Sequence, residues 1–241
     1  MFHFKHFSLY HENSSIKIGT DSVLLAAVPT LPNAHSVLDI GCGCGVIAFV
    51  TAFRLKKLFP DSQHNIIGID IDERSIEDAR RNLVFFPKSE NQHIDFINIS
   101  LQEYSKAGKK FDLIVCNPPF FSNSLKPASE RKRQGKHSDN NLSFKELADN
   151  VTELLTPNGH FHLILPTNES DIFKELVDNK LHKFQETDII PVKGEKPNRR
   201  IMVFGRDGAI PTSHNTLTIR ASNGLYTEEY RDITADFLFV K

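Results

Sequence analysis

Short apolar segments alternate with amphipathic ones along most of the chain, and this alternation limits the possible folds. It predicts a mostly parallel β-sheet covered by helices, because parallel strands need crossover connections. The predicted strands cover residues 36–40, 65–69, 94–98, 111–116, 160–165, 187–192 and 201–204, and the predicted helices begin near residues 46, 72, 142 and 168. Residues 193–200 are too few for a crossover helix, so we expect the last strand pair to be antiparallel. The sequence therefore predicts a doubly wound, seven-stranded, mostly parallel α/β sheet with a terminal antiparallel strand.

The length of 241 residues predicts a single domain over 1–241. Hydrophobic residues make up 39% of the chain and charged residues 24%, which excludes disordered and fibrous classes. The longest apolar run, 23–28, is too short to span a membrane, and the first residues lack the pattern of a signal peptide. We therefore expect a cytoplasmic protein with no membrane partner. The sequence does not set the oligomeric state, and a monomer is compatible with it.

A glycine-rich segment, Asp39-Ile40-Gly41-Cys42-Gly43-Cys44-Gly45, joins the first predicted strand to its helix. Nucleotides bind at this position in doubly wound sheets. The third glycine comes one residue earlier than in the dinucleotide fingerprint, which argues against NAD. Asp39 precedes the glycines, and a carboxylate there suits a ligand with a positive amino group better than a pyrophosphate. The alternative is a tight strand-to-helix turn with no ligand.

A second carboxylate, Asp70, ends the next predicted strand and could accept hydrogen bonds from both hydroxyls of a ribose. Together the two acids suggest an adenosine linked to an amino acid. Asp72 is better explained as a helix cap. Cys42 and Cys44 lack partners for a zinc site, so we expect small buried side chains and predict no metal.

The segment Asn117-Pro118-Pro119-Phe120 follows the fourth predicted strand directly. The prolines end sheet pairing, because proline lacks an N–H group and forces the preceding residue into extended geometry. The segment offers an amide oxygen, an unpaired carbonyl and an aromatic ring. Two acceptors can grip the hydrogens of a planar amine and orient its nitrogen lone pair toward an electrophile. A proline turn with a core phenylalanine is the structural alternative.

These features together resemble the class I methyltransferases that use S-adenosylmethionine, in particular those that methylate amino nitrogens. The whole chain resembles the bacterial tRNA(1)(Val) adenine N6-methyltransferase family. The residues that extend the resemblance beyond the glycine-rich segment, Asp70 and Asn117–Phe120 are Lys17–Asp21, Leu24-Leu25, Leu142–Phe144 and Tyr226–Tyr230.

The resemblance implies a role for each matching residue. Gly41, Gly43 and Gly45 would cradle the methionine part of the cofactor, with Asp39 near its amino group and Asp70 on its ribose. Asn117 and the Pro118 carbonyl, followed by Pro119, would hold the adenine amino group, and Phe120 would stack on the extruded base. Thr20 and Asp21 would lie in an N-terminal extension, residues 1–34, that covers the cofactor pocket. Many relatives contact the cofactor's adenine through an acid, where this chain offers the Ser100 hydroxyl or the Leu101 N–H.

The implied activity is methyl transfer from S-adenosylmethionine to the N6 amino group of adenosine 37 of valine tRNA. Other amino-group acceptors remain open, namely ribosomal RNA, DNA adenine and a protein glutamine. A non-catalytic RNA-binding protein of the same fold is the alternative from another class.

Two basic clusters could bind tRNA even though the net charge is only −1. The first lies in a predicted mobile basic loop, 122–141, and the second joins the last two predicted strands. The residues are Lys126, Arg131, Lys132, Arg133 and Lys136 in the first cluster, and Lys193, Lys196, Arg199 and Arg200 in the second. A flexible solvated loop and a soluble surface are the respective alternatives. The aromatic residues Phe2, Phe4, Phe7 and Tyr10 could stack on RNA bases, but packing over the sheet is the favoured interpretation.

Overall fold

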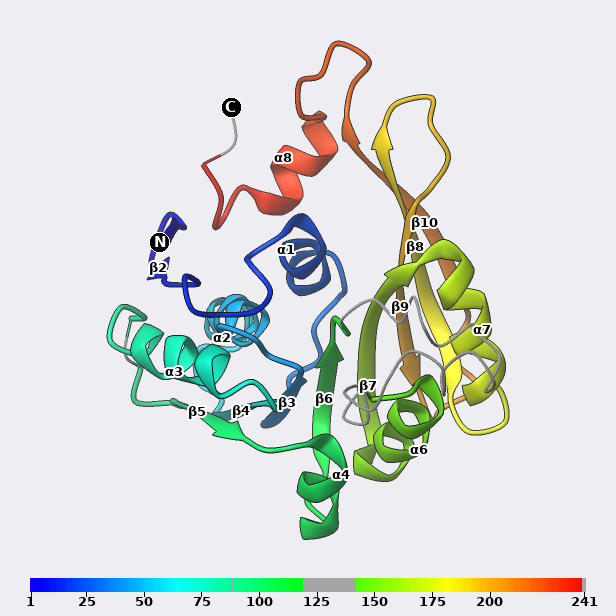
Figure 1. Cartoon of the computed structure of the whole chain (residues 1–241). Coiled ribbons are helices and arrows are strands. Elements are labelled where there is room, and N and C mark those ends of the chain that lie inside the picture. The colour runs from blue at the N-terminus through cyan, green and yellow to red at the C-terminus, as the bar shows by residue number, and fades with distance from the viewer. Residues whose placement is uncertain (88, 119–141, 240–241) are drawn as a thin grey trace, which may run out of the picture.

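A computed structural model gives the structure of the protein and describes residues 1–87, 89–118 and 142–239 (Figure 1). Its centre is an eight-stranded sheet in the order β10-β8-β9-β7-β6-β3-β4-β5. The strands are β3 (Ser36–Ile40), β4 (His64–Asp70), β5 (Gln92–Asn98), β6 (Phe111–Cys116), β7 (Leu155–Pro166), β8 (His182–Val192), β9 (Arg199–Gly205) and β10 (Ser213–Arg220). Strand β9 is antiparallel to both neighbours, β7 and β8, and every other neighbouring pair is parallel.

The predicted fold class and the antiparallel pair β8–β9 are confirmed, and the sheet has one strand more than predicted. The additional strand, β10, lies at an edge. Its first residues, Ser213–Thr216, are polar and exposed, so they lack the apolar pattern by which a strand is recognised. A two-stranded hairpin of β1 (Phe2–His3) and β2 (Ser8–Leu9) stands apart from the main sheet.

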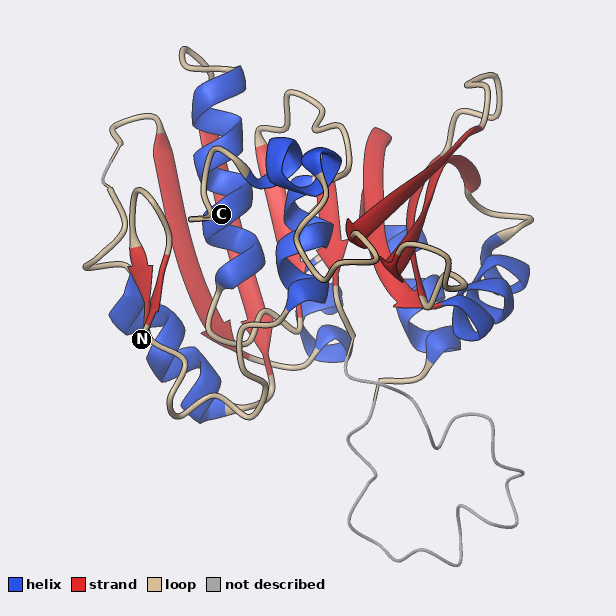
Figure 2. Cartoon of the chain, turned by 90° about the horizontal axis from the view of Figure 1, so that it is seen from above, coloured by secondary structure: helices blue, strands red, loops and turns tan. Residues whose placement is uncertain are grey.

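Helices cover both faces of the sheet, as Figure 2 shows. One face packs against α1 (Thr20–Ala27), α2 (Val46–Leu58), α3 (Glu73–Asn82) and α8 (Glu228–Thr234), and the other packs against α4 (Leu101–Tyr104), α6 (Phe144–Leu154) and α7 (Thr167–Val177). A short 3₁₀ helix covers Ser105–Ala107. Successive residues of a strand alternate between the two cores: Val37 belongs to the first and Leu38 to the second.

Local sequence sets the start of two helices. The carboxylate of Asp72 accepts a hydrogen bond from the Arg74 N–H and caps α3, which confirms its predicted role. Ser143 and Glu146 form a reciprocal capping box at the start of α6. Both caps satisfy backbone donors that a helix leaves unpaired at its first turn.

The N-terminal segment is held to α3 by two buried polar side chains. Asp78 accepts hydrogen bonds from the backbone N–H groups of Asn13 and Ser14. The side-chain amide of Asn82 donates to the carbonyls of both Tyr10 and Cys44, so it joins this segment to the glycine-rich turn. Phe4 and Phe7 are buried in the first core, as expected for the aromatic start, whereas Phe2 and Tyr10 are only partly buried.

No helix in the described part of the chain is long and apolar enough to cross a membrane.

Candidate active site

The carboxyl ends of three neighbouring parallel strands, β3, β4 and β6, lie in register with one another. Ile40 of β3 pairs with Ile69 of β4 and with Cys116 of β6. Gly41 follows Ile40, Asp70 follows Ile69 and Asn117 follows Cys116. The pairing therefore brings these three residues together although they lie far apart in the sequence. This edge, where the parallel strands end, is the usual ligand site of a doubly wound sheet.

The turn after β3 approaches the site through backbone rather than side chains. The N–H groups of Gly41 and Cys42 both donate to the Ile69 carbonyl, at 2.9 and 3.0 Å, which fixes the turn to the end of β4. Gly41 and Gly43 have φ angles of +67° and +54°, and a Cβ atom at either would meet nothing within 4 Å. These two glycines thus border open space, as a ligand cradle requires.

Asp70 connects the glycine-rich turn to the start of α3. One carboxylate oxygen accepts the Gly43 N–H at 2.8 Å, and the other accepts the Asp72 N–H at 2.9 Å. Burial raises the pKa of this carboxyl, although the two backbone donors oppose the shift. Each oxygen keeps a further lone pair, so the carboxylate can still accept hydroxyl groups.

Asp39 is completely buried beneath the same turn. Its Oδ2 accepts the Ala48 N–H at 3.0 Å, whereas Oδ1 has no hydrogen-bond partner in the described part of the chain. Burial raises the pKa of Asp39 to about 7, and the nearby Asp70 adds to this effect. A cation bound beside Asp39 would stabilise its charged form and so supply the missing partner.

The three cysteines around this turn are packing residues. Cys42, Cys44 and Cys116 are free and buried, as the sequence predicts for the first two. Burial raises the pKa of the Cys44 thiol to about 12 and that of the other two thiols well above the ordinary value. Such thiols stay protonated, and a protonated thiol is a poor nucleophile.

Asn117 lies immediately after β6 and is oriented by helix α1. Its amide nitrogen donates to the Ser22 hydroxyl at 2.9 Å, which leaves the amide oxygen as the acceptor that the site can offer. Pro118 is buried beside it. Pro119 and Phe120 lie outside the described residues, as do the predicted basic loop, 122–141, and its five basic side chains.

The start of α1 also contacts the far half of the sheet. Asp21 accepts a hydrogen bond from Arg199 Nε at 2.8 Å, and Thr20 is exposed at the first position of the helix. Sequence reasoning did not find Ser22 as the partner of Asn117. No local signal marks it, because it is a single hydroxyl just before the apolar run 23–28.

Ser100 caps helix α4: its hydroxyl accepts the Glu103 N–H and donates to the Glu103 carboxylate. This role accounts for the Ser100 side chain. The N–H of Leu101, the first residue of α4, has no acceptor within the helix because of its position. Of the two groups predicted to replace the usual acid, the Leu101 N–H is thus the one without an acceptor inside the helix.

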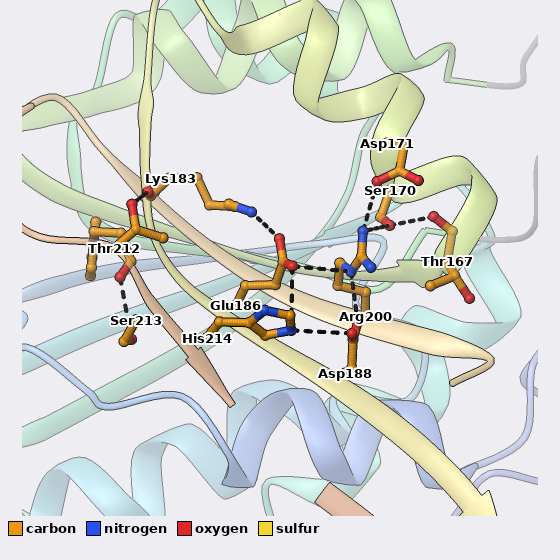
Figure 3. A network of polar contacts seen from close by, with 11 residues as sticks. Thr167, Ser170, Asp171, Lys183, Glu186, Asp188, Arg200, Thr212, Ser213 and His214 are labelled. Atoms are coloured by element: carbon orange, nitrogen blue, oxygen red, sulfur yellow. Dashed lines mark hydrogen bonds and ion pairs between the residues drawn. The ribbon is translucent and has the colours of Figure 1, made fainter. Parts of the chain in front are cut away.

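The second basic cluster divides into paired and exposed members. Arg200 forms ion pairs with Asp188 and Asp171, both at 2.7 Å, and Arg199 is paired with Asp21 (Figure 3 shows the Arg200 network). Lys193 and Lys196 are exposed in the connection between β8 and β9. The four residues are thus not equivalent as candidates for phosphate contacts.

Three possible metal ligands, Glu186, Asp188 and His214, also meet in this network. Arg200 pairs with both carboxylates, and Lys183 pairs with Glu186. Because side-chain cations already neutralise the two acids, we interpret the cluster as structural ion pairing between strands rather than as a metal centre.

Comparison with known proteins agrees with this geometry. Residues 32–213 match the family described as "Methyltransferase domain". A tRNA1(Val) (adenine(37)-N6)-methyltransferase of Bacteroides thetaiotaomicron is 31% identical, over 98% of this chain and 96% of the relative. The protein of the same name from Phocaeicola vulgatus is 34% identical, with the same coverage.

A solved structure has the same fold. The crystal structure of a predicted O-methyltransferase from Agrobacterium tumefaciens superposes with a TM-score of 0.66 at 17% identity, and the match covers 90% of this chain and 96% of the other. The family match and the full-length relatives, together with the three strand ends in register, show that this chain belongs to the methyltransferase family that includes the tRNA1(Val) (adenine(37)-N6)-methyltransferases.

Proposed function

We propose that the protein transfers a methyl group from S-adenosylmethionine to the N6 amino group of adenosine 37 in valine tRNA. The observation that carries the proposal is the register that places Gly41, Asp70 and Asn117 at the ends of three adjacent strands. This arrangement sets an amide acceptor beside a site suited to an adenosine with a cationic amino-acid group. A cytoplasmic location is part of the proposal, since tRNA is the substrate.

The residues present fit the proposed cofactor. The unpartnered Oδ1 of Asp39 can receive its ammonium group, directly or through water, and the backbone at Gly41 and Gly43 borders open space. Asp70 can accept the ribose hydroxyls, and the Leu101 N–H can donate to the adenine. When bound, S-adenosylmethionine supplies an electrophilic methyl group, which passes to a nitrogen lone pair as the carbon–sulfur bond breaks and a neutral thioether remains.

The protein's own part in the reaction is to position the amine. The Asn117 side-chain oxygen and the Pro118 carbonyl would accept the two N6 hydrogens, so that the nitrogen lone pair points at the methyl group. Ser22 fixes the side-chain amide in the orientation that presents its oxygen. After transfer one N6 proton passes to solvent, and the two acceptors stabilise the positive charge that the nitrogen carries until then.

The N-terminal extension would limit access to this site. Support comes from the backbone of Asn13 and Ser14, which is bound to Asp78, and from Ser15, whose N–H donates to Asp72 two residues beyond the ribose acid. These contacts support a position of the 13–15 segment beside the proposed cofactor pocket.

The choice of tRNA as acceptor rests on the full-length relatives, whose names specify adenosine 37 of valine tRNA. The test is to incubate the protein with labelled S-adenosylmethionine and an unmodified valine tRNA transcript, and then to identify the labelled nucleoside after digestion. We expect N6-methyladenosine at position 37. Label in ribosomal RNA, DNA or protein, with none in tRNA, would overturn the substrate but not the chemistry.

Asn117→Ala tests the catalytic residue. It should abolish transfer and leave cofactor binding, measured by calorimetry, nearly unchanged. The matched control is Asn179→Ala, an exposed asparagine after α7, which should keep full activity. Loss of cofactor binding together with transfer in Asn117→Ala would contradict the role given to this residue.

A further inference from the structure

Strands β8 and β10 end at the same edge of the sheet as the candidate active site. Both run parallel to β6, because β9 reverses direction once between β7 and β8. Arg220, the last residue of β10, pairs with Val192 of β8, and its carbonyl accepts the Lys193 N–H at 2.8 Å. In Figure 1 the ends of β8 and β10 point to the same side as the tip of β6.

A short chain of contacts connects these strand ends to the catalytic asparagine. Ser22 binds Asn117, and the neighbouring Asp21 binds Arg199, the first residue of β9. The residues just before Arg199 form the β8–β9 connection, which carries Lys193 and Lys196. We call Lys193, Lys196 and Arg220 the distal basic surface.

Arg220 is held in place by stacking and by a hydrogen bond rather than by an acid. Its guanidinium carbon lies 4.1 Å from the ring centroid of Tyr226, and Nη1 donates to the Gly224 carbonyl at 2.7 Å. Tyr226 stacks in turn on the buried ring of Tyr230, with centroids 4.8 Å apart. Within the described part of the chain Arg220 has no carboxylate partner, in contrast to Arg199 and Arg200.

The segment that supports this stack is itself firmly attached. The Thr227 hydroxyl accepts the Tyr230 N–H and so caps α8, and it also donates to the Thr218 carbonyl of β10. The Tyr226–Tyr230 segment, noted in the sequence for its resemblance to the family, therefore fixes an arginine at the end of β10. Its guanidinium keeps most of its N–H donors for an external anion.

We propose that the distal basic surface binds the phosphate backbone of the RNA substrate and so holds the target nucleotide at Asn117. The proposal rests on the proposed function for the identity of the RNA. The positive charge of the distal basic surface is suited to phosphates, because Lys193 and Lys196 are exposed and Arg220 is preorganised. Glu195, exposed between the two lysines, is the acid that opposes them in this turn.

The test measures the dissociation constant of the full-length protein for an unmodified valine tRNA transcript at several salt concentrations. Each phosphate contact to unpaired RNA contributes about 0.7 to the slope of log affinity against log salt, which corresponds to about fivefold in affinity at 0.1 M salt. Arg220→Ala should therefore weaken binding about fivefold. Lys193→Ala/Lys196→Ala should weaken it about 25-fold and reduce the slope by about 1.4.

The matched control is Lys106→Ala/Lys109→Ala, which removes two exposed lysines before β6, at the opposite edge of the sheet. It should leave the slope unchanged. Glu195→Gln should act in the opposite direction and tighten binding. Cofactor affinity should stay constant in every variant, and the unfolding midpoint should stay constant in the lysine and Glu195 variants. The exposed lysine pair provides the test if Arg220→Ala does not fold.

Equal salt slopes in the wild type and in the β8–β9 lysine variant would overturn the proposal, as would an equal loss in the control pair. Nucleoside analysis of the same tRNA separates this failure from failure of the proposed function. Methylated tRNA with unchanged slopes would refute only the surface. Salt-sensitive binding that depends on the surface, without methylation, would support the surface and refute only the reaction.

Discussion

Asp39 couples cofactor binding to pH, because its carboxyl group is buried and one of its two oxygens, Oδ1, has no hydrogen-bond partner in the described part of the chain. Its pKa of about 7 means that the free protein takes up a proton there as the pH falls below neutral. A bound ammonium group favours the carboxylate, so we expect cofactor affinity to rise between pH 6 and 7.5. Calorimetry of the wild type and Asp39→Asn across this range checks the prediction. The Asp39→Asn side chain does not titrate, so this variant shows the pH dependence that comes from ionisation of the cofactor itself. Identical pH dependence of cofactor affinity in the two proteins would contradict the role of Asp39.

Ser22 is a positioning residue for the proposed reaction, since it acts through Asn117. Ser22→Ala removes the hydroxyl that accepts the amide hydrogen. A hydrogen bond of this kind contributes about 0.5–1.5 kcal/mol, so we expect kcat to fall about two- to tenfold. The KM for S-adenosylmethionine should not change. Equal losses in kcat and in cofactor affinity would instead indicate a general distortion of the site.

Among the elements, strands β8, β9 and β10 are joined by an ion-pair network centred on Arg200 in addition to their backbone pairing. Arg200 on β9 pairs with Asp188 and Glu186 of β8, and His214 of β10 contacts the same two acids (Figure 3). Arg200→Ala would leave the buried Asp188 carboxylate without its main cation, whereas Glu186 keeps Lys183, and it should destabilise the fold by about 3 kcal/mol. Urea unfolding measures this, with the exposed Lys196→Ala as control. An unchanged midpoint would show that the network contributes little to stability.

The elements that carry strong periodicity were predictable from the sequence, and those fixed by distant contacts were not. The strands of the central sheet and the cap at Asp72 follow from local residue patterns. The strand β10 did not, because half of it is polar and it owes its position to pairing with β8. The same holds within the site. Asp39, Asp70 and Asn117 could be found because each lies at or next to a strand end. The Asn117–Ser22 contact joins residues 95 positions apart and has no local signature.

For the molecule as a whole, a buried histidine should limit stability in acid. His162 of β7 is fully buried, and neither ring nitrogen has a partner in the described part of the chain. Burial, with smaller contributions from His160 and Arg54, lowers its pKa well below 6.5. The unfolded chain therefore binds a proton that the folded protein resists, so stability is lost as the pH falls below about 6.5.

His162→Leu should reduce this acid sensitivity. Below pH 6.5 the loss attributable to His162 grows by up to about 1.4 kcal/mol per pH unit, and the variant should lack it. Denaturant unfolding at pH 7 and pH 5 provides the measurement. His93→Gln, which replaces an exposed histidine on β5, is the control and should keep the wild-type difference between the two pH values.

The beginning and the end of the described chain are bound to each other. The Lys5 N–H donates to the Phe237 carbonyl at 2.9 Å, and the Lys5 ammonium group reaches the Ala235 carbonyl, 230 residues away in sequence. During synthesis the segment around Lys5 therefore emerges from the ribosome long before its partner exists. At the usual 5–20 residues per second the delay is roughly 10–50 seconds. For that time the region around Lys5 lacks its C-terminal partners, and the N-terminal segment is held by its contacts with α2 and α3.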